Sequence, residues 1–122
     1  RLQIYRRIGG LNTVVEVNTM RDELRDRFGQ LPAAVEGMLY QMHVKLLAQD
    51  ANATAILHRD NNAEVRLPYL VELDRPRLER SIGSGVRVTR TAVEVPMVEG
   101  WQQRLLNVLV YLATNVRQAV GI

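Results

Sequence analysis

The sequence predicts an α+β fold: an N-terminal layer of three helices, a small antiparallel sheet of three or four strands, a short connecting helix and a long C-terminal helix. Three observations support this class. Apolar residues recur at intervals of three and four near both ends of the chain, as they do in amphipathic helices. β-type runs separated by polar turn residues lie in the middle of the chain. The resulting order of helices, hairpin, helix, strand and helix is typical of an α+β domain.

The first predicted helix runs from Leu2 to Ile8, because Leu2, Tyr5 and Ile8 are spaced by threes and share one face. Gly9-Gly10 ends it, since adjacent glycines form helices poorly. The open face of this helix carries Arg1, Arg6 and Arg7.

The second helix, predicted between Thr13 and Gly29, has the clearest signals in the chain. Thr13 followed by Glu16 forms a capping box, in which the hydroxyl accepts from a free helical N–H and the carboxylate reaches back. Gly29 suits the point where the chain leaves the helix with positive φ. One apolar stripe is expected to face the core, formed by Val17, Met20, Leu24 and Phe28.

Beside this stripe the second helix carries a mixed-charge edge. At 100° per residue, Glu23, Asp26 and Arg27 fall together on one flank. We expect these three side chains to be exposed.

A third helix is predicted from Pro32 to about Gln49, because proline is favoured at the start of a helix. One of its faces is apolar and contains Val35, Met38, Leu39, Met42, Leu46 and Leu47. Short loops between the three helices indicate that neighbouring helices pack as hairpins.

The β-type runs Ala53 to Arg59 and Glu64 to Leu70 predict an antiparallel hairpin around the polar turn Asp60-Asn61-Asn62. Proline cannot donate a hydrogen bond to a sheet, so Pro68 places its strand at an edge or ends it there. Val86 to Val95 is also β-type, but its alternation slips. The slip allows either a bulge or a tight hairpin around Arg90-Thr91.

Two further helices are predicted. Asp74 caps a short one from Arg75 to Ile82, which Gly83 to Gly85 ends. The last helix runs from Glu99 to about Ala119, with apolar residues on more than one side, so it lies between two layers or meets a partner. Its main apolar face contains Trp101, Leu105, Val108, Leu109, Leu112 and Val116, and Leu106, Val110 and Tyr111 widen it.

Length and composition indicate one folded domain, residues 1–122. The chain has 122 residues, 47% of them hydrophobic and 24% charged, as in compact globular domains. It has no cysteine, which excludes disulfides and thiolate metal sites and is compatible with a cytoplasmic location. No apolar run is long enough to span a membrane. Because the chain begins with Arg1, we interpret it as a fragment of a larger protein.

The charge pattern argues against a concentrated basic patch. The formal charge is +3 and the isoelectric point about 9.8, but arginines alternate with acids along the chain, as in Arg21-Asp22-Glu23. Such alternation is typical of a solvated surface.

The sequence contains no convincing catalytic, cofactor or metal site, so we expect a domain that is not an enzyme. Gly83 to Gly85 leads into a strand and lacks the lysine of a phosphate loop. His43 and His58 lie on different predicted elements, whereas zinc needs three or four converging ligands. No serine sits at a strand-to-helix turn, which disfavours a hydrolase triad.

Two segments resemble the C-terminal, or TRCF, domain of the bacterial transcription-repair coupling factors. Residues 1–8, Arg-Leu-Gln-Ile-Tyr-Arg-Arg-Ile, are similar to the family's Arg-Leu-x-x-Tyr-Lys/Arg-Arg-Ile/Leu. Residues 23–32, Glu-Leu-Arg-Asp-Arg-Phe-Gly-Gln-Leu-Pro, are similar to Glu-Leu-x-Asp-Arg-Phe-Gly-x-Leu-Pro. Arg25 departs from the pattern, because the family often has an apolar residue there. Beyond Asp50 the order of elements agrees.

The resemblance implies a regulatory, non-catalytic role inside an ATP-dependent DNA translocase that removes stalled RNA polymerase. It implies that the domain binds the UvrB-like module of the same polypeptide, hides the surface that recruits UvrA and restrains translocation. The family's contact residues map onto Glu23, Asp26 and Arg27.

Two other hypotheses stay open at this point. The chain could be an accessory nucleic-acid-binding domain that uses its arginines, or it could form oligomers through the last helix. The arginines of the first alternative are Arg1, Arg6, Arg7, Arg66, Arg87 and Arg90.

Overall fold

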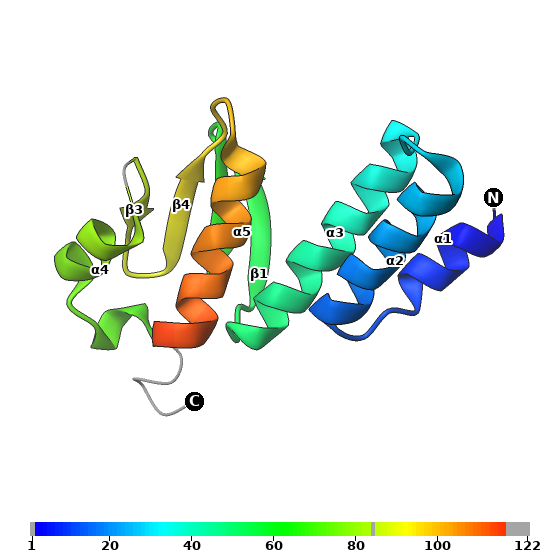
Figure 1. Ribbon diagram of the computed structural model, residues 1–122. Helices are drawn as coiled ribbons and strands as arrows, with labels where there is room; N and C mark the ends of the chain where they lie inside the picture. The colour runs from blue at the N-terminus through cyan, green and yellow to red at the C-terminus, as the bar shows by residue number, and fades with distance from the viewer. Residues whose placement is uncertain (1, 84, 117–122) are drawn as a thin grey trace. The chain divides into compact units, whose positions relative to one another are not determined.

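The predicted α+β class is confirmed. The computed structural model describes residues 2–83 and 85–116, and over these residues the chain forms five α-helices and a four-stranded antiparallel sheet (Figure 1). The chain divides into two compact units, residues 1–46 and 47–122. Each unit has its own buried residues and is described separately below.

The first unit contains the three predicted helices, α1 (Leu2–Gly9), α2 (Val14–Phe28) and the greater part of α3 (Ala33–Asp50). Their bounds agree with the sequence prediction to within two residues. The apolar faces of the helices meet in one core, because each helix is amphipathic and must cover its stripe. The buried members of this core are Ile8, Val17, Met20, Leu24, Leu31, Val35, Leu39 and Leu46.

The caps of α2 form as predicted, with one difference. The Thr13 hydroxyl accepts a hydrogen bond of 3.1 Å from the Glu16 N–H. The Glu16 carboxylate accepts from the N–H of Asn12 at 3.0 Å, one residue before the group that a capping box usually uses. At the other end Gly29 has φ of 71°, and its N–H donates to the Arg25 carbonyl at 2.8 Å.

Two predicted members of the buried stripes are exposed instead. Phe28 and Leu2 keep 59% and 64% of their surface open to solvent, so the prediction that they belong to the packed faces is wrong. Phe28 is the last residue of α2 and Leu2 the first of α1. Both lie at element ends, where the helix offers fewer turns to pack against its neighbours.

Arg25, which departs from the family pattern, is also exposed. Its Nη2 lies 2.5 Å from a carboxylate oxygen of Glu36 on α3. The arginine therefore joins α2 and α3 through an ion pair.

The sheet lies in the second unit and has the strand order β1-β2-β4-β3. Its strands are β1 (Ala55–Arg59), β2 (Asn62–Arg66), β3 (Arg87–Val88) and β4 (Ala92–Pro96). The first hairpin has a two-residue turn in which Asp60 and Asn61 take φ of 52° and 61°, the conformation that such turns need and that Asn and Asp tolerate. Both strands are shorter than predicted.

Two questions that the sequence left open are answered by the pairing of the strands. β2 is a central strand and ends at Arg66, so Pro68 lies beyond the strand and not at an edge of the sheet. Val88 pairs with Val93, and the Thr89 N–H donates to the Ala92 carbonyl at 2.8 Å. Residues 86–95 therefore form a tight hairpin and not a bulged strand.

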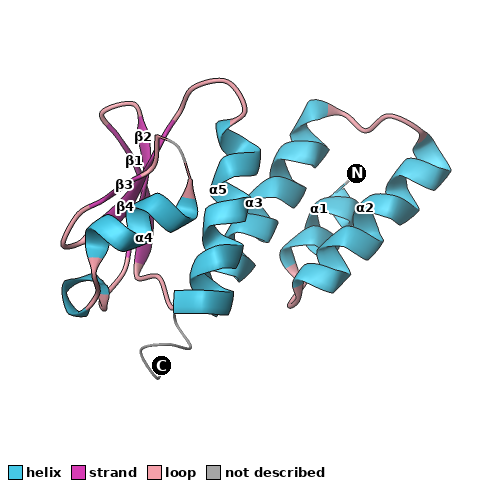
Figure 2. Ribbon diagram, turned by 60° about the vertical axis from the view of Figure 1, so that its left-hand side comes forward, coloured by secondary structure: helices cyan, strands magenta, loops and turns pink. Residues whose placement is uncertain are grey.

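The helix α5 (Trp101–Tyr111) lies over one face of the sheet (Figures 1 and 2). Val65, Val93 and Val95 share one face of the sheet and are fully buried, and the buried residues of α5 are Leu105, Val108 and Leu109. A π-helical segment, Leu112–Val116, follows. The prediction that the helix continues to Ala119 concerns residues outside those described. α5 begins at Trp101, two residues later than predicted. Gly100, which precedes it, has φ of 82°.

The short helix α4 (Arg75–Ile82) has its predicted bounds. The Asp74 carboxylate accepts from the Arg77 N–H at 3.2 Å, which is the expected cap. A 3-10 turn, Leu70–Glu72, precedes it.

Candidate partner-binding surface

The three residues predicted to contact a partner lie together on the exposed side of α2. We call Glu23, Asp26 and Arg27 the charged edge. All three side chains are exposed, and spacings of three and four residues make Glu23 a helical neighbour of both others. The structure thus brings them onto one surface that is separate from the core residues of the same helix.

The members of the charged edge differ in their contacts. The Glu23 carboxylate lies 3.3 Å from Nη2 of Arg7, and both side chains are more than half exposed. Asp26 has no hydrogen bond or ion pair with any residue described. The Arg27 guanidinium carbon lies 5.4 Å from the centroid of the Phe28 ring. An exposed pair such as Arg7–Glu23 contributes about 0–1 kcal/mol, so a partner can displace it at little cost.

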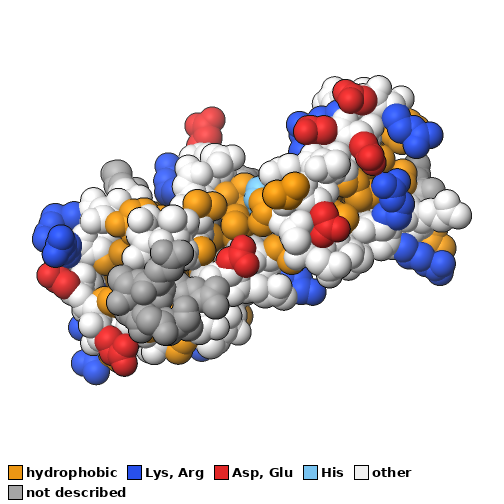
Figure 3. Space-filling view, turned by 60° about the horizontal axis from the view of Figure 1, so that its bottom comes forward, with side chains coloured by type: hydrophobic (Ala, Val, Ile, Leu, Met, Phe, Trp, Pro, Cys, Tyr) orange, Lys and Arg blue, Asp and Glu red, His pale blue; other side chains and the backbone are white. Residues whose placement is uncertain are grey.

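The opposite flank of α2 is different, because its charges are matched inside the unit. Glu36 of α3 pairs with Arg25, and its second carboxylate oxygen lies 3.7 Å from Nε of Arg21. Figure 3 shows acidic and basic side chains interspersed over this helical unit, with apolar patches between them. Asp26 and Arg27 of the charged edge thus lack the ion pairs that Arg21 and Arg25 form.

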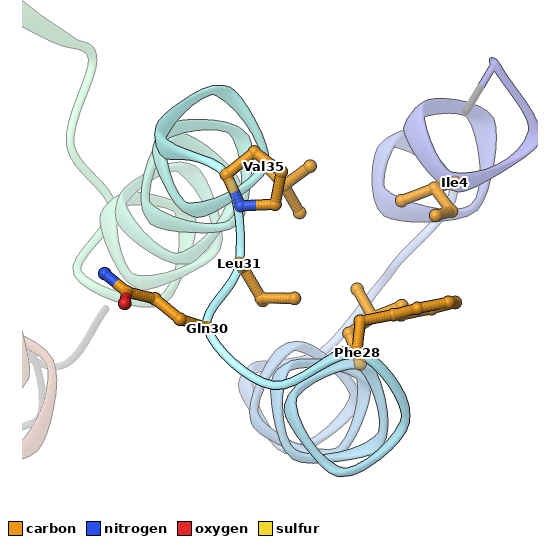
Figure 4. A pocket seen from close by; sticks show the side chains of 7 residues that line it. Ile4, Phe28, Gln30, Leu31 and Val35 are labelled. Atoms are coloured by element: carbon orange, nitrogen blue, oxygen red, sulfur yellow. The ribbon is translucent and has the colours of Figure 1, made fainter.

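An apolar pocket of about 450 Å³ opens next to the charged edge. In Figure 4 the side chains of Ile4, Phe28 and Leu31 point toward one space between the three helices, whereas Gln30 points away. The pocket is lined by Ile4, Leu24, Phe28, Gln30, Leu31, Pro32 and Val35. Sequence reasoning missed it because Phe28 has the spacing of a core residue. Its place at the helix end, next to Gly29, was the signal that could have indicated it.

The two histidines do not form a site with each other. His58 is exposed on β1, and His43 is half-buried on α3. Burial and the positive charge of Arg21 lower the pKa of His43 below its ordinary value of 6.5, so the ring is neutral near pH 7. Burial also raises the pKa of Tyr40 on the same helix to about 12. Among the described residues, no three potential metal ligands lie close together.

The arginines of the nucleic-acid alternative are partly matched by acids. Arg7 pairs with Glu23, and Arg66 lies 3.6 Å from the carboxylate of Glu64, a buried residue of β2 that also faces Arg59 at 3.9 Å. Arg87 lies opposite Glu94 in the β3–β4 ladder, but the two side chains form no ion pair in the described structure. Arg6 and Arg90 are exposed, and Arg1 lies outside the described residues. Positive charge on the sheet is therefore interleaved with acids.

Within residues 2–83 and 85–116, no helix is long and apolar enough to cross a membrane. The prediction of a cytoplasmic protein stays a prediction.

Comparison with known proteins gives consistent matches. A family model described as the TRCF domain matches residues 1–75. Three similar curated proteins all carry the name transcription-repair-coupling factor. They are those of Rickettsia conorii, 38% identical over 66 residues (54% of this chain, 6% of that protein), Bacillus subtilis, 25% over 135 (99% and 11%), and Mycobacterium bovis, 29% over 137 (100% and 11%).

The chain spans only 6–11% of the length of these relatives. No solved structure matches it significantly.

Proposed function

This chain belongs to the TRCF domain family, and on that premise we propose that it is a non-catalytic, autoinhibitory domain of a transcription-repair coupling factor. The charged edge binds the UvrB-like module of the same polypeptide. This contact masks the UvrA-binding surface and restrains the ATP-dependent DNA translocase. RNA polymerase and DNA are engaged by other parts of that cytoplasmic protein.

One observation carries the proposal. Asp26 and Arg27 are exposed and have no ion pair with any described residue, while the arginines on the other flank of α2 are paired with Glu36. Two charges of opposite sign on rigid helical backbone suit a partner of complementary charge, which fixes orientation more than affinity. This supports a docking role for the charged edge.

The magnitudes suit a releasable contact inside one polypeptide. Each exposed ion pair contributes about 0.2–1 kcal/mol, which is too little for a stable complex between separate molecules. A tethered partner has an effective concentration of roughly millimolar. Keeping such a contact 99% closed requires about 2.7 kcal/mol. At a millimolar effective concentration this ratio corresponds to a dissociation constant of about 10 μM between the separate parts, an affinity that a competing partner can overcome.

Charge reversal in the full-length protein tests the proposal. Asp26→Arg and Glu23→Arg replace attraction to the partner with repulsion. We therefore expect the open population, the fraction of molecules in which this contact is broken, to rise about 5- to 10-fold, since each 1.4 kcal/mol changes an equilibrium tenfold. ATP hydrolysis and UvrA binding should increase together. Glu99→Arg makes the same charge change at an exposed position of the second unit and serves as the control.

Unchanged hydrolysis and unchanged UvrA binding in both edge variants would contradict the proposal. Unfolding curves of the 122-residue chain show whether each variant still folds.

A further inference from the structure

The apolar pocket beside Phe28 opens against core residues of the first unit, Leu24, Leu31 and Val35. Its walls come from all three helices and the loop between α2 and α3. The Phe28 ring, 59% exposed, stands at its edge instead of filling it (Figure 4). A pocket of about 450 Å³ is within the range that binds ligands, roughly 300–1,000 Å³.

Exposed aromatic surface of this kind points to a protein partner. Aromatic residues dominate the few positions that carry most of the binding energy in interfaces, and these positions are surrounded by polar contacts that exclude water. Leu2, at the start of α1, is 64% exposed. Apolar residues at one end of a helical bundle, next to charged ones, match the anatomy of an interface with an apolar centre and a polar rim.

Arg27 connects the pocket to the charged edge. It belongs to that edge, and its guanidinium lies over the ring of Phe28, which lines the pocket. No carboxylate lies within ion-pair distance of Arg27 among the described residues. A partner that extends from the charged edge to the pocket must therefore pass Arg27, and it gains most if it brings a negative charge there.

We propose that the pocket receives one apolar side chain of the partner that binds the charged edge, and that a carboxylate beside this side chain pairs with Arg27. The inference rests on the proposed function, because it assumes the same partner. It adds an apolar anchor to a contact that otherwise consists of exposed ion pairs. Such an anchor explains how a contact with few charges holds the partner in one position on the charged edge.

A fluorine label at Phe28 tests whether the pocket is occupied. Phe28 is the only phenylalanine of the 122-residue chain, so a fluorinated analogue gives one ¹⁹F resonance for the empty pocket. The same analogue is placed at this position alone in the full-length protein. We expect a different resonance there, and a return to the empty-pocket position when Asp26→Arg opens the contact.

The outcomes separate the two proposals. If Asp26→Arg raises ATP hydrolysis but the resonance is the same in the full-length protein and the 122-residue chain, the pocket is empty and this inference is wrong, while the proposed function stands. If Asp26→Arg changes neither hydrolysis nor the resonance, both are wrong. A resonance of the 122-residue chain that moves with protein concentration indicates a second copy in the pocket and also overturns the inference.

Substitution of Phe28 gives an independent measurement. Phe28→Ala removes the exposed wall of the pocket and should raise the open population of the full-length protein about tenfold, whereas Phe28→Tyr should keep it low. Val15→Ala is the matched control, because Val15 is an exposed apolar residue of the same helix, 73% open to solvent. Equal hydrolysis in Phe28→Ala and Val15→Ala contradicts the inference.

Discussion

Neighbouring residues of one helix have different roles because their surroundings differ. Arg21 and Arg25 on α2 are held by Glu36, whereas Arg27 has the face of Phe28 beside it and no ion pair with a described residue. A cation over an exposed ring contributes about 0.5–1 kcal/mol. That is too little to prevent the guanidinium from turning toward a partner. His43 shows the same dependence on surroundings, since burial beside Arg21 lowers its pKa.

The lowered pKa of His43 predicts a pH dependence of stability. The folded state favours the neutral form of the ring. As the pH falls below about 6.5, the pKa in the unfolded state, the unfolded state therefore binds more protons than the folded state. The contribution of His43 to the free energy of unfolding is therefore fully present above this pH, and it is lost as the pH is lowered through the folded-state pKa.

We expect urea unfolding at pH 5 and 7.5 to show a smaller loss of stability in His43→Gln than in the parent chain. His58→Gln, at the exposed histidine, is the control and should leave the loss unchanged. An identical pH dependence of stability in the parent chain and His43→Gln would contradict this prediction.

At the scale of the elements, helix ends and turns are fixed by short-range hydrogen bonds. Thr13 and Asp74 each accept from the N–H three residues ahead, and both helices begin where these caps place them. The position of the charged edge depends on α2 being helical, because the 100° periodicity of the helix sets which of its residues face outward. A cap that fails would loosen the first turn of α2, several turns away from Asp26.

Removing the Thr13 cap should therefore cost stability. Thr13→Ala leaves the Glu16 N–H without its acceptor and should lower the free energy of unfolding by about 1 kcal/mol. Thr19→Ala is the matched control, since Thr19 is exposed inside α2, where alanine is the better helix former. Thermal or urea unfolding measures both, and an equal effect of the two substitutions would show that the cap contributes nothing.

For the whole molecule, the distribution of charge matters more than its total. The net charge is +3, but buried Glu64 and in-register Glu94 stand among the arginines of the sheet. Arg59 and Arg66 of the sheet both lie within ion-pair distance of Glu64 and are therefore less available to phosphates. The chain also divides into two compact units between Leu46 and Leu47, and its action as a single regulatory domain, residues 1–122, stays a prediction.

The nucleic-acid alternative makes a measurable claim at this scale. Neutralising several phosphates releases counterions, so the logarithm of the binding constant falls steeply with the logarithm of the salt concentration. We expect the 122-residue chain to show no measurable binding to duplex DNA between about 50 and 200 mM salt. Binding with a steep slope would favour the accessory DNA-binding role instead. Sedimentation of the same samples tests the third hypothesis, oligomers formed through α5.

The sequence by itself determined the elements, because caps, turns and apolar spacing act within a few residues. The Thr13 and Asp74 caps, the turn at Asp60-Asn61 and the periodicity of α2 all needed only local hydrogen bonds and allowed φ angles. They also placed Glu23, Asp26 and Arg27 on one exposed flank. Local agreement of this kind is what makes a sequence specify its elements.

The tertiary structure decided what depends on distant neighbours. Phe28 has the spacing of a core residue, yet at the end of α2 it is 59% exposed, and a pocket opens beside it. The pairing of Val88 with Val93, and the end of β2 before Pro68, were likewise set by which strand lies alongside. Burial depends on the packing around a residue, and the spacing of apolar residues along one helix or strand does not determine it.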